Sequence, residues 1–207
     1  MLVDLKVNEF VNVLASDAPA PGGGSASALA GAMGIGLVGM VATLTTGKEK
    51  YKEYEDIVQE VLADANILRK QFLEAIDRDT DAFNVVTAAY TLPKATDEEK
   101  AARSSAIQLA LKEATKVPFE LMELCLQALK CAEKAIGKTN KNAASDLGVA
   151  ALNLKSAVQG AWLNVLINLG GIKDEAFVNE YRQNGTQICT QVVALADIVY
   201  NEILKSL

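Results

Sequence analysis

The chain has 207 residues, enough for a domain with a substantial core, and its 26 acidic residues outnumber its 20 basic ones. The resulting net charge of −6 argues against nucleic acid as a main partner. The sequence contains no histidine, which excludes a Ser-His triad, an imidazole base and imidazole metal ligands. Any proton transfer must therefore fall to a carboxylate, a lysine, a tyrosine or a cysteine.

The first predicted helix is short and is followed by an irregular turn. Its apolar residues have helical spacing from Val7 to Leu14. The turn Pro19-Ala-Pro-Gly-Gly-Gly-Ser-Ala-Ser27 follows, and Ser25 or Ser27 has the position of an N-cap. Backbone N–H groups at such a helix start form a site for an anionic or electron-rich ligand group, although many glycine-rich turns are only flexible. No Gly-Lys-Ser/Thr follows, so the turn is not a nucleotide P-loop.

The second predicted helix extends to about Thr46 and is uncharged, since no charge occurs between Asp17 and Lys48. Its length would suit a membrane span, but it is rich in alanine and glycine and no basic flank precedes it. Asp4 and Glu9 interrupt the N-terminus, so no signal peptide is visible. We therefore expect a cytoplasmic protein without membrane contact, in which this helix is central or lies at an interface. Three cysteines without metal-ligand spacing suit reduced thiols in that compartment.

The third predicted helix, at about Lys48–Tyr90, has an aspartate in its apolar stripe. The apolar members are Ile57, Val61, Ala65, Leu68, Phe72, Ile76, Phe83, Val86 and Tyr90. Asp79 occupies a position in this stripe, whereas Asp77 and Asp81 fall on other faces, where solvent is expected. A desolvated Asp79 would have a raised pKa and could exchange protons near neutrality. A buried aspartate that caps or bridges helices is the alternative.

Four more helices are expected, at about residues 96–118, 121–137, 143–169 and 174–207. A capping box at Thr96–Glu99 starts the first of them, Pro118 separates it from the second, and Gly137 ends the second. No β-alternation or hairpin signal occurs anywhere. The sequence therefore predicts an all-α fold, an antiparallel up-and-down bundle of long helices, as a single domain over residues 1–207.

The helix expected at residues 143–169 carries a second polar stripe. Its members at helical spacing are Asp146, Ala150, Asn153, Ala157, Gly160 and Asn164. The stripe is polar at its ends and small in its middle, as one side of a polar pocket would be. An interhelical hydrogen-bond ladder is the alternative, and the pattern alone favours it slightly.

Six short segments, spread over the whole chain, carry a family resemblance. They are Pro19-Ala-Pro-Gly-Gly-Gly-Ser25, Asp79-Thr-Asp-Ala-Phe83, Leu92-Pro93-Lys94, Asn140-Lys-Asn-Ala-Ala-Ser-Asp146, Asn164-Val-Leu-Ile-Asn-Leu169 and Ile172-Lys-Asp-Glu-Ala-Phe177. In these six segments the sequence resembles the cyclodeaminase/cyclohydrolase family. That family includes the C-terminal half of formimidoyltransferase-cyclodeaminase and stand-alone methenyltetrahydrofolate cyclohydrolases. The resemblance implies a helical homodimer that binds a tetrahydrofolate derivative between its helices.

The resemblance also implies one of two reactions at the same one-carbon unit. Members either add water to 5,10-methenyltetrahydrofolate to give 10-formyltetrahydrofolate, or close 5-formimidoyltetrahydrofolate to the methenyl compound with loss of ammonia. A chain of this length looks more like the stand-alone cyclohydrolase, and the cyclodeaminase is the alternative. No metal and no cofactor beyond the tetrahydrofolate substrate is expected.

With that chemistry in view, we expect Asp79 to be the general base that deprotonates the attacking water. Asp146 would share the acid/base work or neutralise the cationic methenyl group. The expected substrate-binding residues are Pro21, Gly22, Gly23, Gly24, Ser25, Lys94, Asn142, Ser145, Asn164 and Asn168. The glycines would approach the ligand through their backbone, the asparagines would hydrogen-bond the pterin or fix the carboxylates, and Lys94 or Lys141 would meet the glutamate tail.

Two alternatives belong to other classes of function. A Mg²⁺ site between Asp79 and Asp146 would make activity sensitive to a chelator, whereas the Glu-x-x-His pairs of carboxylate-bridged metal bundles cannot occur without histidine. A non-enzymatic helical adaptor would use its Asp and Asn stripes only structurally. Asp79→Asn would then leave function intact and would tend to raise stability.

Overall fold

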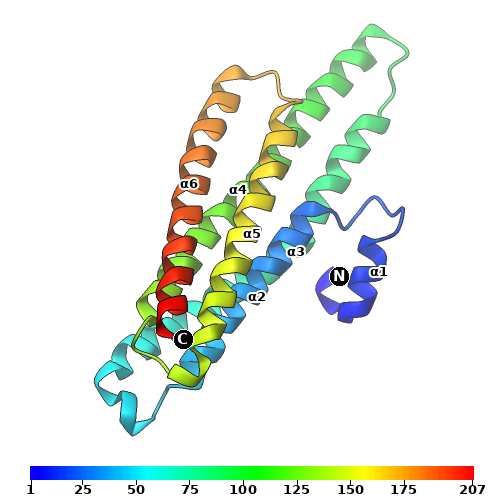
Figure 1. Ribbon diagram of the computed structural model, residues 1–207. Helices are drawn as coiled ribbons and strands as arrows, with labels where there is room; N and C mark the ends of the chain where they lie inside the picture. The colour runs from blue at the N-terminus through cyan, green and yellow to red at the C-terminus, as the bar shows by residue number, and fades with distance from the viewer.

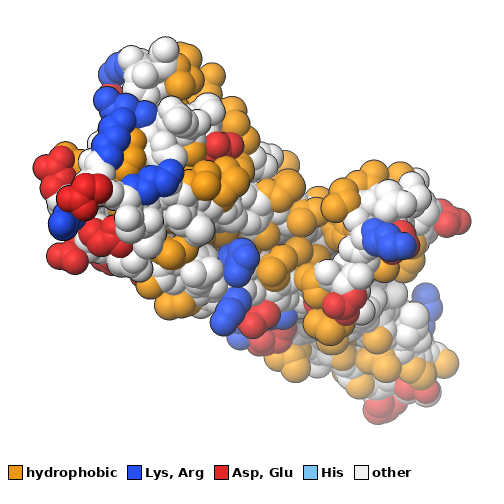
Figure 2. Space-filling view, turned by 90° about the horizontal axis from the view of Figure 1, so that it is seen from below, with side chains coloured by type: hydrophobic (Ala, Val, Ile, Leu, Met, Phe, Trp, Pro, Cys, Tyr) orange, Lys and Arg blue, Asp and Glu red, His pale blue; other side chains and the backbone are white.

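The computed structural model describes all 207 residues and contains helices but no strands. The helices are α1 (Val7–Leu14), α2 (Gly23–Thr43), α3 (Glu55–Thr91), α4 (Asp97–Ala135), α5 (Ala144–Leu169) and α6 (Glu175–Ser206), with 3₁₀ turns at Leu2–Asp4, Glu49–Tyr54 and Lys141–Ala143. Figure 1 shows α2 to α6 running alternately up and down one elongated bundle, with α1 projecting beside it. Hydrophobic side chains form several exposed groups on the face seen from below (Figure 2). The predicted all-α bundle is confirmed.

Helix α4 is continuous through Pro118, so the prediction of two separate helices there was wrong. A proline inside a helix removes the N–H that would bond the carbonyl four residues earlier. That carbonyl belongs to Ala114, and it accepts a hydrogen bond of 3.0 Å from Nδ2 of Asn168 on α5. A side chain from another helix therefore replaces the lost partner, which a pattern in α4 alone could not reveal.

The start of α2 also differs from the prediction. The N-cap residue is Gly22, which has no side chain to cap the helix, and Ser25 lies inside the first turn. The hydroxyl of Ser27 donates to the Gly23 carbonyl at 2.7 Å. Neither serine is therefore an N-cap, and Ser25 is free to bond a neighbouring helix instead.

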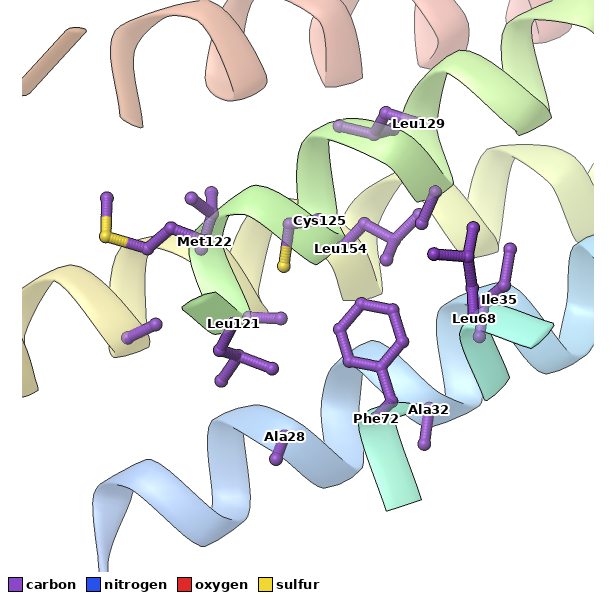
Figure 3. Packing of buried hydrophobic residues seen from close by; sticks show 14 of the residues in the cluster. Ala28, Ala32, Ile35, Leu68, Phe72, Leu121, Met122, Cys125, Leu129 and Leu154 are labelled. Carbon is purple, nitrogen blue, oxygen red and sulfur yellow. The ribbon is translucent and has the colours of Figure 1, made fainter. Parts of the chain in front are cut away.

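Helix α2 packs against both α3 and α5 and forms the middle of the bundle. It is the one helix with the length and composition of a membrane span, and half of its most apolar stretch is buried inside the bundle. Its glycines allow close packing: a Cβ on Gly31 would overlap the Phe72 ring, and a Cβ on Gly34 would lie 3.1 Å from the Ala150 carbonyl oxygen. Figure 3 shows the Phe72 ring between α2 and side chains such as Leu121 and Leu154. The small residues of α2 therefore allow α3 and α5 to pack close to it.

The turn after α2 is tied to the turn before α5 by Thr45. Its buried hydroxyl donates to the Val41 carbonyl at 2.7 Å and accepts the N–H of Asn140 at 2.9 Å. We expect Thr45→Val to lower the free energy of unfolding by about 1–3 kcal/mol, because the N–H of Asn140 would lose its partner. Urea denaturation followed by circular dichroism measures this difference.

Thr43→Val is the matched control for this prediction. The Thr43 hydroxyl is exposed and bonds only to the Gly39 carbonyl in its own helix. Its replacement should change the free energy of unfolding by no more than about 0.5 kcal/mol. Equal losses in the two variants would mean that the link to Asn140 contributes nothing.

Candidate active site

A cavity of about 340 Å³ lies between the start of α2 and parts of α3, α4 and α5. Its polar lining residues are Gly22, Gly23, Gly24, Asp79, Thr80, Asn164 and Asn168. Phe83, Val86 and Ile167 supply larger apolar surfaces. The volume and this mixture of apolar surface with a few polar groups are typical of small-molecule sites.

The apolar stripe of α3 explains why the cavity forms at Asp79. The stripe is buried from Val61 to Ile76, as predicted for a core face, but Phe83 and Tyr90 farther along it are half-exposed. Asp79 is thus the position at which the core face of α3 becomes the surface of the cavity.

Asp79 lies against the first turn of α2. The Ser25 hydroxyl lies 3.0 Å from Oδ2 of Asp79 and 2.9 Å from the Ile76 carbonyl oxygen, and its single proton can be donated to either. Thr80 Oγ1 is 3.3 Å from the same hydroxyl. A Cβ on Gly24 would overlap the Asp79 carboxylate, so glycine is required for this approach.

Two opposing effects determine the pKa of Asp79. Burial raises the pKa of the carboxyl, and hydrogen bonds from the side chain and backbone of Ser25 lower it; burial is the larger effect, so the pKa is raised. A half-buried carboxylate with a raised pKa, held by hydrogen bonds beside a cavity, has the properties of a general acid or base.

Asn164 and Asn168 supply further oxygen acceptors to the cavity. Asn164 donates its Nδ2 to the Gly160 carbonyl at 2.9 Å, and Asn168 donates its Nδ2 to Ala114. Their Oδ1 atoms accept no hydrogen bond within the protein and join the Asp79 carboxylate as oxygen acceptors. No lysine or arginine lines the cavity. The site is complementary to a cationic or N–H-rich ligand group.

The structure brings together only some of the residues predicted from the sequence. Those that line the cavity are Gly22, Gly23, Gly24, Asp79, Asn164 and Asn168. Ser25 lies behind Asp79, and Pro21 is buried between two lining residues of the turn. Lys94 lies in the α3–α4 connection and lines a different cavity.

Asn142, Ser145 and Asp146 lie at the opposite end of α5 from Asn164. At about 1.5 Å of rise per residue, Asp146 and Asn164 are about 27 Å apart along the helix axis. Within one chain, Asp146 therefore lies far from Asp79. The two carboxylates of one chain cannot bind the same Mg²⁺ ion. Lys141 lies at that same distant end.

The middle of the predicted polar stripe of α5 packs against α2 instead of lining a pocket. Ala150 and Ala157 are fully buried, and a Cβ on Gly160 would overlap the Ser27 hydroxyl. The polar-pocket interpretation therefore applies only to the Asn164 end of the stripe, and close helix packing explains the small residues.

Asp77 corrects another expectation, since it is not simply solvated. Its Oδ1 accepts the N–H of Leu2 at 2.6 Å, and its Oδ2 is buried without a partner. The N-terminal 3₁₀ turn, Leu2–Asp4, is thereby attached to α3. Asp81 is exposed, as predicted.

Several cavity residues were not singled out from the sequence. Phe83 and Val86 were predicted only as members of the apolar stripe of α3, although the position of Asp79 in that stripe could have marked them as site residues. Ala114 and Ile167 had no such signal, because they reach the cavity through the packing of α4 and α5 against α3.

Comparisons with known proteins identify the family of this chain. The family model described as formiminotransferase-cyclodeaminase matches residues 6–187. The chain is 44% identical over 200 residues to a methenyltetrahydrofolate cyclohydrolase of Methylorubrum extorquens, covering 97% of this chain and 96% of that protein. It is 31% identical to the formimidoyltransferase-cyclodeaminase of Rattus norvegicus, where the match covers 98% of this chain but 37% of that longer protein.

A solved structure gives the same result at the level of the fold. The crystal structure of a formiminotetrahydrofolate cyclodeaminase from Thermotoga maritima matches this chain with a TM-score of 0.82 and 31% sequence identity. The match covers 100% of this chain and 98% of that one. Sequence and fold thus agree over essentially the whole chain, which belongs to the formiminotransferase-cyclodeaminase family.

Proposed function

We propose that this chain catalyses the addition of water to 5,10-methenyltetrahydrofolate, giving 10-formyltetrahydrofolate in one-carbon metabolism. The observation that carries this proposal is Asp79, a carboxylate with a raised pKa beside a cavity that contains oxygen acceptors and no basic side chain. The end-to-end similarity to a methenyltetrahydrofolate cyclohydrolase supports the choice of substrate. No cofactor beyond the folate is needed for this reaction.

In the proposed mechanism Asp79 accepts a proton from a water molecule as its oxygen forms a bond to the bridging carbon. The tetrahedral intermediate then collapses: the bond from that carbon to N5 breaks, and Asp79 returns its proton to N5. The hydroxyl of the intermediate loses its proton to solvent as the formyl C=O forms on N10. One molecule of water is consumed and one proton is released.

The charge of the cavity suits this substrate. The methenyl bridge is part of an amidinium cation, which the Asp79 carboxylate and the Oδ1 atoms of Asn164 and Asn168 would stabilise. The first turn of α2 would contact the ligand through its backbone, because Gly22, Gly23 and Gly24 present no side chains there.

A second candidate reaction is the closure of 5-formimidoyltetrahydrofolate with release of ammonia. It is supported by the cyclodeaminase whose crystal structure this chain resembles. Asp79 would then carry the proton between N10 and the departing amine, using the same position in the cavity.

We also propose that the protein is a cytoplasmic homodimer. Its three cysteines form no disulfide, as expected in a reducing compartment. One face of α5 exposes Leu152, Leu163 and Ile167, the last at 76%, and neighbouring α2 exposes Met33 and Met40. An apolar surface of this kind on two adjacent helices favours burial against a second copy. Light scattering coupled to size-exclusion chromatography should give twice the monomer mass.

A spectrophotometric assay with purified protein tests the proposed reaction. Loss of 5,10-methenyltetrahydrofolate above its spontaneous rate supports the cyclohydrolase. Activity only on 5-formimidoyltetrahydrofolate, with ammonia released, would assign the second reaction. If neither substrate reacts faster than without protein, the proposed function is wrong.

Ser25→Ala tests how the pKa of Asp79 controls the reaction. Removing the hydroxyl removes a hydrogen bond that lowers the pKa of Asp79, so the pKa should rise further. A base is inactive when protonated, so the acidic limb of the kcat/KM–pH profile should move to higher pH. At pH 7, kcat/KM should fall about tenfold, in keeping with a hydrogen bond to a charged group.

Ser27→Ala is the control for the pH profile. The Ser27 hydroxyl donates to the Gly23 carbonyl and has no hydrogen bond to Asp79. Its profile should keep the wild-type shape, and an unshifted profile for Ser25→Ala would contradict the role given to Asp79 as the titrating base.

A further inference from the structure

Pro118 is buried in the middle of α4, and the helix continues through it. A proline has no N–H, so the Ala114 carbonyl, four residues earlier, receives no hydrogen bond from position 118. The proline ring also crowds that carbonyl. Proline is the least favourable residue inside a helix, so its presence at this buried position requires a compensating contact.

The compensating contact comes from Asn168 in the last turn of α5. Its Nδ2 donates to the Ala114 carbonyl at 3.0 Å. A carbonyl oxygen only accepts hydrogen bonds, so it must face the nitrogen of the asparagine amide and not the oxygen. This bond therefore decides which end of the Asn168 amide points at α4.

The other end of the amide is open to the cavity. Ala114 and Asn168 both line the cavity that contains Asp79. Oδ1 of Asn168 accepts no hydrogen bond within the protein, and it is not buried, since the only buried side-chain oxygen or nitrogen without a partner is Oδ2 of Asp77. The amide oxygen is therefore available to a ligand that lies beside Asp79.

Asn164, four residues earlier on the same face of α5, has a different partner. Its Nδ2 donates to the Gly160 carbonyl, one turn back in its own helix. The equivalent partner for Asn168 would be the Asn164 carbonyl, yet its Nδ2 bonds across to α4 instead. A carbonyl that lacks its helical hydrogen bond needs a new donor, and this need explains the difference.

We infer that Pro118 is a positioning residue of the active site: it frees the Ala114 carbonyl, which holds the Asn168 amide with its oxygen towards the substrate. The inference rests on the proposed folate reaction and adds to it a residue that does not touch the substrate. The methenyl bridge is cationic, so an amide oxygen attracts it, whereas an amide NH₂ group in the same place would repel it. Pro118 thereby fixes the sign of the dipole that Asn168 presents.

The first test is Pro118→Ala, which restores an N–H that competes with Asn168 for the Ala114 carbonyl. With the amide free to turn, the KM for 5,10-methenyltetrahydrofolate should rise about fivefold, in keeping with the net value of one hydrogen bond. The kcat should stay within about twofold of wild type, because the acceptor already acts on the cationic ground state. A general distortion that displaced Asp79 would lower kcat instead, and that result would contradict the inference.

A double variant shows whether Pro118 acts through Asn168. Asn168→Ala should raise the KM about tenfold, as expected for a lost hydrogen bond to a charged group. Pro118→Ala/Asn168→Ala should have the same KM as Asn168→Ala, since the proline has no amide left to position. If the two effects multiply, Pro118 acts by another route and the inference is wrong.

Two further variants separate the restored N–H from other changes in α4. Pro118→Val restores the N–H but keeps most of the buried volume, so its KM should rise as much as that of Pro118→Ala. A rise in Pro118→Ala alone would assign the effect to lost volume and overturn the inference. Thr115→Val is the matched control, because the buried Thr115 hydroxyl donates to the Leu111 carbonyl in its own helix. It should keep the wild-type KM, and an equal rise there would mean that any disturbance of this turn has the same effect.

Urea denaturation tests the link without any folate. Asn168→Ala leaves the Ala114 carbonyl without a partner, and the N–H that Pro118→Ala restores would supply one. Pro118→Ala should therefore raise the urea midpoint more in the Asn168→Ala protein than in the wild type. Equal gains would contradict the link between the two residues. If neither folate reacts, the proposed function fails, and this comparison still decides whether Pro118 controls the orientation of Asn168.

Discussion

Replacing Asp79 with asparagine should lower kcat for 5,10-methenyltetrahydrofolate by about 10²–10⁴-fold, the usual contribution of a general base. The substituted amide keeps the shape of the carboxyl and can still bond Ser25, but it cannot accept a proton from water. The KM should change much less than kcat, because the cavity retains its other polar and apolar groups. Steady-state kinetics on the purified variant measures both.

The same variant should be at least as stable as the wild type at pH 7. The pKa of Asp79 is raised above the ordinary value of 3.8, so the folded protein binds this proton more tightly than the unfolded chain. The charged form therefore lowers the stability of the fold at neutral pH. That loss disappears as the pH falls through the raised pKa towards 3.8, where the stabilities of variant and wild type should converge.

Asp81→Asn is the control for both measurements. Asp81 is exposed and lies two residues away on the same helix. Its replacement should leave kcat and the urea midpoint close to wild type. Full activity in Asp79→Asn with the fold retained would refute the catalytic role of Asp79.

Gly24→Ala should lower kcat/KM by about 10²-fold, although the change adds a single methyl group. The new Cβ would overlap the Asp79 carboxylate, and either the carboxylate or the first turn of α2 must move. A displacement of about 1 Å at a reacting group is enough for a loss of this size. Kinetics should show the loss mainly in kcat, and the amount of helix measured by circular dichroism should be unchanged.

Gly39→Ala is the matched control on the same helix. A Cβ there would have only an ordinary contact, 3.5 Å from Ala65 Cβ. Alanine is favoured over glycine inside a helix by about 0.5–1 kcal/mol, so this variant should be fully active and slightly more stable. Wild-type kinetics in Gly24→Ala would show that the close approach of α2 to Asp79 does not matter for catalysis.

The sequence identified the residue around which the cavity forms, because its signal is local. Asp79 interrupts an apolar stripe with a period of 3.6 residues, and that period depends only on nearby positions of one helix. The glycine-rich turn was likewise visible as a segment without side chains. What the sequence could not show is that Ser25 bonds to Asp79 rather than capping its own helix.

The errors came from contacts between distant segments. Pro118 does not break α4, because Asn168 from α5 bonds the carbonyl that the proline leaves free. Asp77 is not solvated, because the N-terminal turn folds back onto it. Asp146 and Asn164 share a face of α5, yet spacing within a helix says nothing about which end of that face lines a cavity.

The sequence by itself determined the all-α class, the positions of most helices and the family to which the chain belongs. These follow from hydrophobic periodicity, capping residues and short motifs, all of which act within a few residues along the chain. Only the tertiary structure decided which faces meet: it placed Asp79 against α2, left Asp146 at the far end of α5, and gathered Lys94, Lys100, Arg103 and Lys173 around one cavity. The physical reason is that these groupings depend on how whole helices pack, and packing joins residues that no local pattern relates.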